Sequence, residues 1–214
     1  MEGSERTNRH RSVCSRPTAG AEQRWGDGVG ESILEVDRHI QGATGDRILS
    51  TWRAASTPAR ILTVLAAAAC VVVGWESPAT GVSLLVLVGA ALVDAVERRL
   101  PNALVAGAAL PVLIALAGSP ELVRSAALGA LVVAGPLLVT HLVTPSGMGF
   151  GDVKAGAVLG AAMGLIDVEV AVLALVLGLG AGAAWGLVRR ARTIALGPAL
   201  VAGGLLAALI GATA

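Results

Sequence analysis

Long apolar runs separated by short breaks are the feature that most constrains how this chain folds. From residue 58 onward the sequence is almost entirely Ala, Val, Leu, Ile and Gly, and it holds only eight basic and seven acidic side chains. Soluble domains carry about 25% charged residues, whereas this chain carries 14%. The apolar part therefore cannot be an ordinary water-soluble core, and the lipid bilayer replaces water as its solvent.

The breaks divide the apolar part into seven predicted membrane spans. The runs lie at 58–75, 79–96, 103–117, 122–143, 153–166, 168–188 and 194–212. A spanning helix needs about 20 residues, within a range of about 17 to 25, so several runs qualify and 153–166 is short. The predicted fold class is an all-α integral membrane protein, a polytopic bundle of seven transmembrane helices, with six as the alternative.

Residues 1–57 differ from the rest of the chain. They are polar, rich in Gly, Arg, Ser and Thr, and hold half of the 16 basic side chains. Low hydrophobicity with many charges is typical of disorder. We therefore predict a disordered cytoplasmic leader at 1–57 and a transmembrane domain at 58–214. The net charge of only +1 excludes a nucleic-acid binder that works by bulk charge.

The distribution of Arg and Lys predicts how the chain is oriented in the membrane. If the leader is cytoplasmic, 15 basic side chains fall on the inner side, and only Arg124 falls on the outer side. Cytoplasmic loops carry an excess of Lys and Arg. This asymmetry predicts a multi-pass protein of the inner (cytoplasmic) membrane with its N-terminus in the cytoplasm.

Two series of glycines recur at every fourth residue. They are Gly156, Gly160 and Gly164, and then Gly178, Gly182 and Gly186. A spacing of four places each series on one helix face, where small residues let helices approach closely in lipid. Chance spacing in a sequence rich in Ala and Gly is the alternative.

Two carboxylates lie at the edges of predicted spans, where charge is costly. Asp94 ends the second span and Asp152 opens the fifth, and both fall on the predicted cytoplasmic side. Asp152 is four residues before Gly156, so it is expected on the same helix face, pointing into the bundle. Ionisable residues within spans usually mark function. The structural alternative is an interhelical hydrogen bond or a helix end that reaches the headgroups.

Two aspartates on facing helices can share a proton, because like charges a few ångströms apart cannot both ionise cheaply. One carboxylate then acts as a base on water, and the other, protonated, polarises the scissile carbonyl. This is aspartyl-protease chemistry, for which we expect no metal and no cofactor. Proton relays also use paired acids, so a small proton-coupled membrane transporter is the alternative function. The clustering of the acids at one face favours the protease.

The residues around the two aspartates carry a resemblance to a known family. The first stretch reads Asp94-Ala-Val-Glu-Arg-Arg-Leu-Pro-Asn102, and the second reads Gly147-Met-Gly-Phe-Gly-Asp152-Val-Lys154. Together they resemble the type IV prepilin peptidases, bacterial membrane aspartyl proteases with a GxGD motif. Ile194-Ala-Leu-Gly-Pro-Ala199 is similar to the Gly-Pro start of that family's last helix. The resemblance covers the chain from about Leu84 to the C-terminus.

The resemblance implies an activity and a set of site residues. It implies an endopeptidase that removes the leader of type IV prepilin or pseudopilin precursors, cutting after a Gly just ahead of the substrate's hydrophobic helix. Asp94 and Asp152 are the expected catalytic pair. The residues expected to bind substrate or shape the site are Gly149, Gly151, Lys154, Pro101, Asn102, Gly197 and Pro198.

Larger members of the family carry a zinc-binding cysteine cluster associated with methylation of the new N-terminus. Cys14 and Cys70 are the two cysteines of this chain, and they cannot form such a cluster. The resemblance therefore implies a short, peptidase-only form without N-methyltransferase activity.

Several motif residues have expected physical roles. Pro101 and Asn102 suit the first turn of the third span, because Pro needs no bonded N–H there. The motif glycines allow positive φ and the close approach of another chain. Lys154 either attracts a carboxylate or lipid phosphate or simply marks the inner interface. His141 has no partner motif, so we expect an ordinary helix-end residue.

Overall fold

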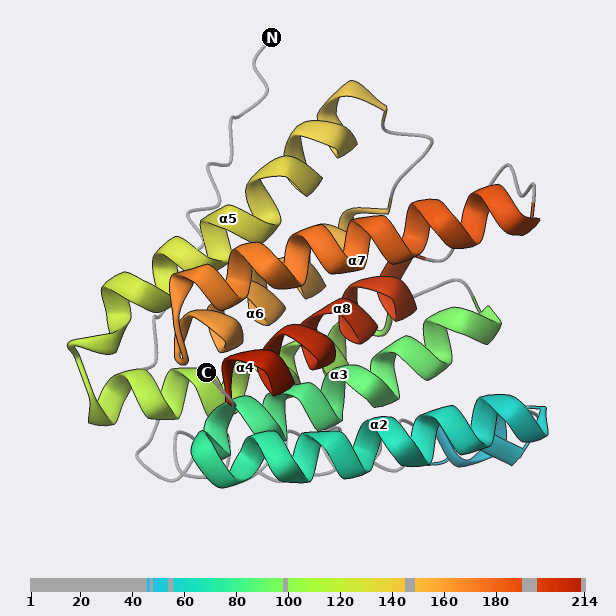
Figure 1. Cartoon of the computed structure of the whole chain (residues 1–214), viewed down its shortest axis with the longest axis horizontal. Coiled ribbons are helices and arrows are strands. Elements are labelled where there is room, and N and C mark those ends of the chain that lie inside the picture. Colours follow the sequence, from blue (N-terminus) through green and yellow to red (C-terminus); the bar gives the residue numbers. More distant parts are fainter. Residues whose placement is uncertain are drawn as a thin grey trace, which may run out of the picture. The chain divides into compact units, whose positions relative to one another are not determined.

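The computed structural model describes residues 46, 48–53, 56–97, 100–144, 149–189 and 196–212. These residues form helices joined by short connections (Figure 1). The helices are α2 (Thr57–Glu76), α3 (Pro78–Glu97), α4 (Asn102–Gly118), α5 (Leu122–Val143), α6 (Phe150–Gly164), α7 (Val168–Arg189) and α8 (Leu196–Gly211). The predicted all-α membrane bundle is confirmed, and each predicted run corresponds to one helix.

Helix length varies across the bundle. Four described helices are long and apolar enough to cross a membrane, over Ala59–Glu76, Pro78–Val96, Leu122–Val143 and Val168–Val188. Helices α4 and α8 are apolar but have 17 and 16 residues, and α6 has 15. At 1.5 Å per residue, α6 reaches only about 22 Å, which is less than the roughly 30 Å of a hydrocarbon core.

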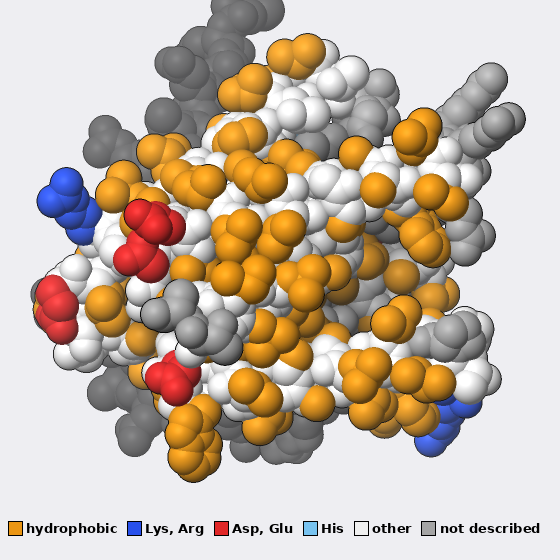
Figure 2. Space-filling model, viewed as in Figure 1, with side chains coloured by type: hydrophobic (Ala, Val, Ile, Leu, Met, Phe, Trp, Pro, Cys, Tyr) orange, Lys and Arg blue, Asp and Glu red, His pale blue; other side chains and the backbone are white. Residues whose placement is uncertain are grey.

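Outward-facing side chains are largely apolar, as contact with lipid requires. Leu62 and Val71 of α2 are 67% and 71% exposed, for example. Figure 2 shows one face of the molecule on which hydrophobic side chains dominate, with the described charged side chains lying near its edges. In water such an apolar surface would promote aggregation, whereas in a bilayer it is the surface in contact with lipid.

Helix α3 occupies the middle of the arrangement. It packs against α2, α4, α6 and α8, and Figure 1 shows α2, α3, α8 and α7 lying side by side in that order. About 61% of the α3 span is buried, compared with 11% of the α2 span. The helix that carries Asp94 is therefore the most enclosed of the four long spans.

Two buried hydroxyl groups tie α3 to its neighbours. Thr80 Oγ1 donates a hydrogen bond of 2.9 Å to the Ala162 carbonyl of α6. Ser83 Oγ donates one of 2.8 Å to the Ala108 carbonyl of α4. Interhelical hydrogen bonds of this kind contribute about 0.6 kcal/mol each on average in membrane proteins. They help to fix α3 relative to the helices that complete the site.

The glycine series of α6 is its contact surface with α5. A Cβ atom on Gly156 would lie 2.5 Å from Leu137 Cδ1, and one on Gly164 would lie 2.5 Å from the Ser125 carbonyl oxygen. Between them, the backbone of Gly160 lies directly against the backbone of Gly129. The close-packing interpretation is confirmed for this series.

The second series plays the same part between α7 and α8. A Cβ atom on Gly178 would lie 3.0 Å from Leu200 Cα, and one on Gly182 would lie 3.2 Å from Leu196 Cδ1. Each series therefore joins two helices that follow one another in the chain.

The predicted leader lies mostly outside the described residues. Of that segment, 48–53 are helical. The compact unit that contains the helices runs over Thr44–Ala214, so it begins before residue 58.

Candidate active site

Two aspartates from different helices come together at one end of the bundle. Asp94 lies in the last turn of α3, which ends at Glu97, and Asp152 is the third residue of α6. Asp152 is near enough to Asp94 for the two carboxylates to interact electrostatically. Residues 58 positions apart in the sequence are thus brought to one place by the packing of α3 against α6.

Asp94 is the more enclosed carboxylate of the pair. Its side chain is only 6% exposed, and its Oδ2 atom has no hydrogen-bond partner among the described residues. The backbone N–H of Gly197 interacts with this carboxylate as a donor. Buried polar atoms without a partner are rare and costly. The Oδ2 atom is thus an acceptor that no described residue uses.

Asp152 is more open than Asp94. It is half-buried in the first turn of α6, where its backbone N–H donates a 3.1 Å hydrogen bond to the Gly149 carbonyl. The backbone of Gly149 also interacts with its carboxylate. The first turn of a helix favours negative charge, because unpaired N–H groups and the helix dipole point toward it.

The start of α8 closes the site on the side of Asp94. Gly197 is buried, and a Cβ atom on it would lie 2.7 Å from Asp94 Oδ2. No other residue allows the helix to come this close to the carboxylate. Pro198 follows in the first turn of α8, where a proline costs no helical hydrogen bond.

The start of α4 is linked to the start of α6. Lys154 Nζ donates a 3.4 Å hydrogen bond to Asn102 Oδ1, which joins the two aspartate motifs directly. Pro101 lies just before α4 as its N-cap, rather than within the first turn as expected. Its carbonyl accepts hydrogen bonds from the N–H groups of Leu104 and Val105, so it still begins the helix.

The two described motif glycines have ordinary backbone conformations. Gly149 has φ of −71°, which is ordinary extended backbone, and Gly151 has no positive φ either. The expectation of positive φ is therefore wrong for these two, and Gly147 lies outside the described residues. Gly151 is needed for close approach, since a Cβ atom on it would lie 3.3 Å from Leu100 Cβ.

Comparison with known proteins agrees with this arrangement. A sequence profile of the type IV leader peptidase family matches residues 81–212, which is more than half of the chain. The chain belongs to the type IV leader peptidase family. A search of curated proteins and a search of solved structures each found no match. The expected family membership is confirmed, and the protein is a membrane peptidase.

The family match covers every part of the peptidase that contributes to the aspartate site. It begins within α3 and ends just beyond α8, so Asp94, Asp152 and Gly197 all lie inside it. Helix α2 lies before the match and packs on α3 and α8. It therefore packs against two helices of the site although it lies outside the matched residues.

Two neighbours of the peptidase site were not predicted from the sequence. The rings of His141 and Phe150 lie 5.5 Å apart, and Lys154 Nζ lies 5.2 Å from the centre of the Phe150 ring. His141 is thus more than a plain helix end, because it packs on the first residue of α6. Phe150 stands inside the GxGD motif, and that position was the signal that could have singled it out.

Among the residues that the structure describes, no three His, Cys, Asp or Glu side chains are grouped as metal ligands would be.

Proposed function

We propose that this peptidase removes the leader of type IV prepilin or pseudopilin precursors at the cytoplasmic face of the inner membrane. Asp94 and Asp152 are its catalytic pair. The observation that carries the proposal is the meeting of these two carboxylates at one end of an apolar bundle. One buried oxygen of Asp94 has no hydrogen-bond partner among the described residues. The family match supports a leader peptidase in particular.

The pair supplies both halves of an acid–base mechanism. One carboxylate accepts a proton from a water molecule, whose oxygen attacks the carbonyl carbon of the scissile peptide bond. The other carboxyl group, protonated, donates its proton to the carbonyl oxygen. The tetrahedral intermediate then collapses, the C–N bond breaks, and the leaving nitrogen takes a proton from the pair. The pair works as a unit, and its two members are not assigned separate roles here.

The position of the pair suits a substrate with a helix on one side of the cut. The substrate's hydrophobic helix stays in lipid, and its polar leader extends into the cytoplasm, so the bond between them lies at the boundary. Asp94 ends a long apolar helix and Asp152 opens a short one, which supports a position of both carboxylates at such a boundary. The predicted orientation, with basic residues inside, makes it the cytoplasmic boundary.

The remaining site residues position the pair. Gly197 and Pro198 bring the start of α8 against Asp94, and the bond between Lys154 and Asn102 joins the starts of α6 and α4. Since the two cysteines of the chain cannot form a zinc-binding cluster, we propose cleavage without N-methylation of the product.

Co-expression with an epitope-tagged prepilin in a peptidase-deficient host tests the proposal. Wild type should shorten the prepilin on a gel, and mass spectrometry should show a product without an added methyl group. Asp94→Asn and Asp152→Asn should each reduce cleavage by at least about 100-fold, because general acid–base catalysis contributes about that much. Immunoblots should show equal membrane levels of all variants.

Asp167→Asn is the matched control. Asp167 is exposed before α7, where its Oδ1 accepts a hydrogen bond from the Glu169 N–H, so cleavage should stay at the wild-type level. Cleavage that survives in either of the other two variants would remove the catalytic assignment. Failure of wild type to cleave any of several prepilins would refute the substrate class.

A further inference from the structure

A short helical segment ahead of α2 has one face toward the bundle and another that is exposed. This surface segment covers residues 48–53, and Figure 1 shows it beside the first turns of α2. Leu49 and Trp52 are 54% and 37% exposed, and Arg53 is exposed as well. Residues three or four apart share one face of a helix, so Leu49, Trp52 and Arg53 form a single exposed face.

The opposite face of the surface segment packs on α3 next to Asp94. Thr51 on this face is buried, with 5% of its surface exposed. A Cβ atom on Gly89 of α3 would lie 3.7 Å from Ile48 Cδ1, which is ordinary van der Waals contact. Ile48 also packs against a buried cluster that includes Val93, the residue just before Asp94. The surface segment therefore contacts α3 within about two helical turns of Asp94.

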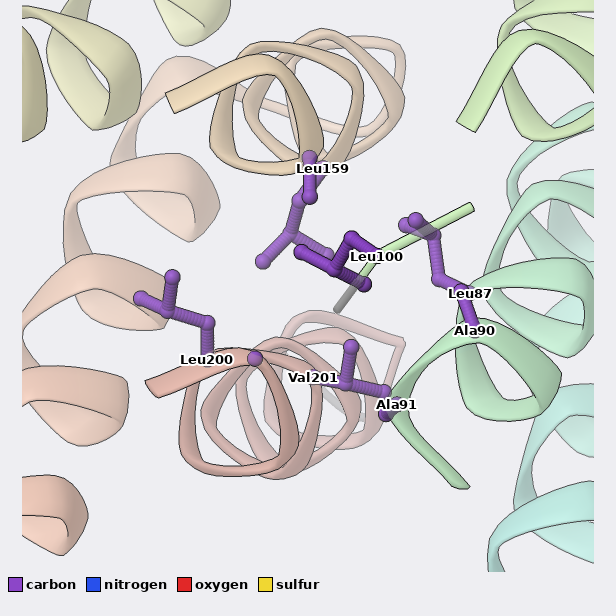
Figure 3. Close-up of a pocket in the computed structure, with 9 residues that line it drawn as sticks. Leu87, Ala90, Ala91, Leu100, Leu159, Leu200 and Val201 are labelled. Carbon is purple, nitrogen blue, oxygen red and sulfur yellow. The ribbon is translucent and has the colours of Figure 1, made fainter. Parts of the chain in front are cut away.

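The same cluster reaches the second aspartate motif. Leu100 packs against it, as Ile48 does, and a Cβ atom on Gly151 would lie 3.3 Å from Leu100 Cβ. On a neighbouring side of α3, Ala91 lies beside Val201 of α8 (Figure 3). The last turns of α3 are thus contacted by α8 on one side and by the surface segment on another.

Arg60 of α2 fixes the end of the surface segment. Its Nε donates a 3.0 Å hydrogen bond to the Trp52 carbonyl, and its guanidinium also donates to the Arg53 carbonyl. The guanidinium carbon lies 5.2 Å from the centre of the Trp52 ring. Basic side chains often bond the last carbonyls of a helix in this way. Two arginines and a tryptophan are therefore grouped at this end of the bundle.

The surface segment lies near the level where the apolar spans end. The span of α2 begins at Ala59, six residues after Arg53, and the span of α3 ends at Val96. Gly89, which faces Ile48, is seven residues before Val96, or about 10 Å along the helix. Helices that lie in the membrane surface bury their apolar face about 5–10 Å deep, which matches this position.

We propose that the surface segment binds anionic lipid headgroups on the side of the aspartate pair, and that this binding holds the end of α3 in its active position. The second half rests on the proposed function. Leu49 and Trp52 enter the interfacial layer, where tryptophan is enriched, and Arg53 and Arg60 provide positive charge for the lipid phosphates. Each Arg near an anionic membrane surface strengthens binding about 5-fold.

Quenching of Trp52 fluorescence by brominated lipid tests the binding. The full-length peptidase with Trp25→Phe, Trp75→Phe and Trp185→Phe retains Trp52 as its one tryptophan. It is placed in liposomes of equal parts phosphatidylcholine and phosphatidylglycerol, in which one lipid or the other carries bromine on its acyl chains. Brominated phosphatidylglycerol should quench Trp52 more strongly than brominated phosphatidylcholine, because the anionic lipid gathers around Arg53.

Removal of one charge should weaken this lipid preference. Arg53→Gln in the same background should lower the preference for phosphatidylglycerol about 5-fold. Arg124→Gln is the matched control, because Arg124 is an exposed arginine near the start of α5, and it should leave the preference unchanged. Equal quenching by both brominated lipids before Arg53 is changed would overturn the headgroup preference. Quenching by neither would mean that protein covers the exposed face.

Cleavage kinetics test the effect on α3. The kcat for one prepilin is compared between liposomes that contain phosphatidylglycerol and liposomes of phosphatidylcholine alone. A bound lipid shifts α3 only by as much as it prefers one arrangement, so anionic lipid should raise the wild-type kcat about 5-fold. Arg53→Gln should lose this gain and Arg124→Gln should keep it. Effects of the lipid on the substrate are common to all three proteins.

The kinetic outcomes separate the two halves of the proposal. No gain in wild type, or the same gain in Arg53→Gln, would overturn the effect of the surface segment on α3. If wild type cleaves no prepilin in either kind of liposome, the proposed function fails. The quenching of Trp52 still decides in that case whether the surface segment binds anionic lipid.

Discussion

One buried oxygen atom of Asp94 carries much of the proposed function. Asp94 Oδ2 lies against Gly197 without a hydrogen-bond partner among the described residues, in a side chain that is only 6% exposed. Unpaired buried polar atoms are rare in folded proteins, and each one is costly. Under the proposed function, Gly197 is a positioning residue, because its missing side chain leaves room for the carboxylate.

Gly197→Ala should misplace Asp94 without unfolding the protein. The added methyl group would lie 2.7 Å from Oδ2, so either the carboxylate or the start of α8 must move. A shift of about 1 Å at a catalytic group can cost roughly 100-fold in rate, and we expect a loss of about 10- to 100-fold in kcat, with KM little changed. Cleavage kinetics in isolated membranes measure it.

Gly180→Ala serves as the control for that substitution. Nothing lies within 4 Å of a Cβ atom at Gly180 on α7, so the rate should equal that of wild type. A full rate in Gly197→Ala, at matched protein levels, would show that Gly197 does not hold the carboxylate in place.

Some of these residues could be predicted from the sequence and others could not. Asp94 and Asp152 stand out because a charge at the edge of an apolar run is unusual, and Gly197 stands in a Gly-Pro pair. Phe150 stands inside the GxGD motif, but its contacts with His141 and Lys154 could not be predicted from that position alone. Leu100 lies in the Leu-Pro-Asn stretch, and no local pattern reveals its contact with Gly151, which is 51 residues further along the chain.

At the scale of helices, the breaks in the apolar pattern predicted helices α2 to α8 to within a few residues, whereas the helical residues 48–53 lie in the predicted leader. Proline marks several of the starts, since Pro78 opens α3 and Pro101 precedes α4. Pro111 and Pro136, by contrast, lie inside α4 and α5. Membrane helices tolerate such prolines because neighbouring groups satisfy the freed carbonyls. Which residues of neighbouring helices face each other could not be predicted from the sequence, and only the structure shows it.

Helix α6 depends on its glycine face for its place beside α5. Gly160→Val would drive a side chain into the Gly129 backbone, so the two helices must separate. Overpacking of this kind costs about 1–3 kcal/mol. At about 2–4 °C per kcal/mol for a chain of this size, the unfolding midpoint in detergent should fall by roughly 2–12 °C.

Gly180→Val is the matched substitution for this prediction, because it meets open space on α7. It should leave the unfolding midpoint within about 2 °C of wild type, as surface substitutions usually do. Equal midpoints for the two variants would show that the α5–α6 contact does not depend on the glycine face.

At the scale of the whole molecule, the uneven distribution of Arg and Lys predicts which end of each helix faces the cytoplasm. Glu121 and Thr144 flank α5 at its two ends, and both are exposed. With the N-terminus in the cytoplasm, the end at Glu121 is external and the end at Thr144 is cytoplasmic. The aspartate pair then lies on the same side as Thr144.

Cysteine labelling measures this orientation. In a background with Cys14→Ser and Cys70→Ala, Glu121→Cys should react with a membrane-impermeant maleimide in intact cells. Thr144→Cys should react only after the cells are permeabilised. The reverse pattern would place the aspartates on the outer face and contradict cleavage at the cytoplasmic side.

The most direct test of the central claim compares single and double variants of the aspartate pair. The measurement is the cleavage rate of one prepilin by purified protein in liposomes, for wild type, Asp94→Asn, Asp152→Asn and the double variant. Catalytic residues that act as a unit show losses that are far from additive. We predict a loss of at least about 100-fold in each single variant and no further loss in the double variant. A double variant slower by the product of the two single losses, or a single variant with the wild-type rate, would contradict a catalytic pair.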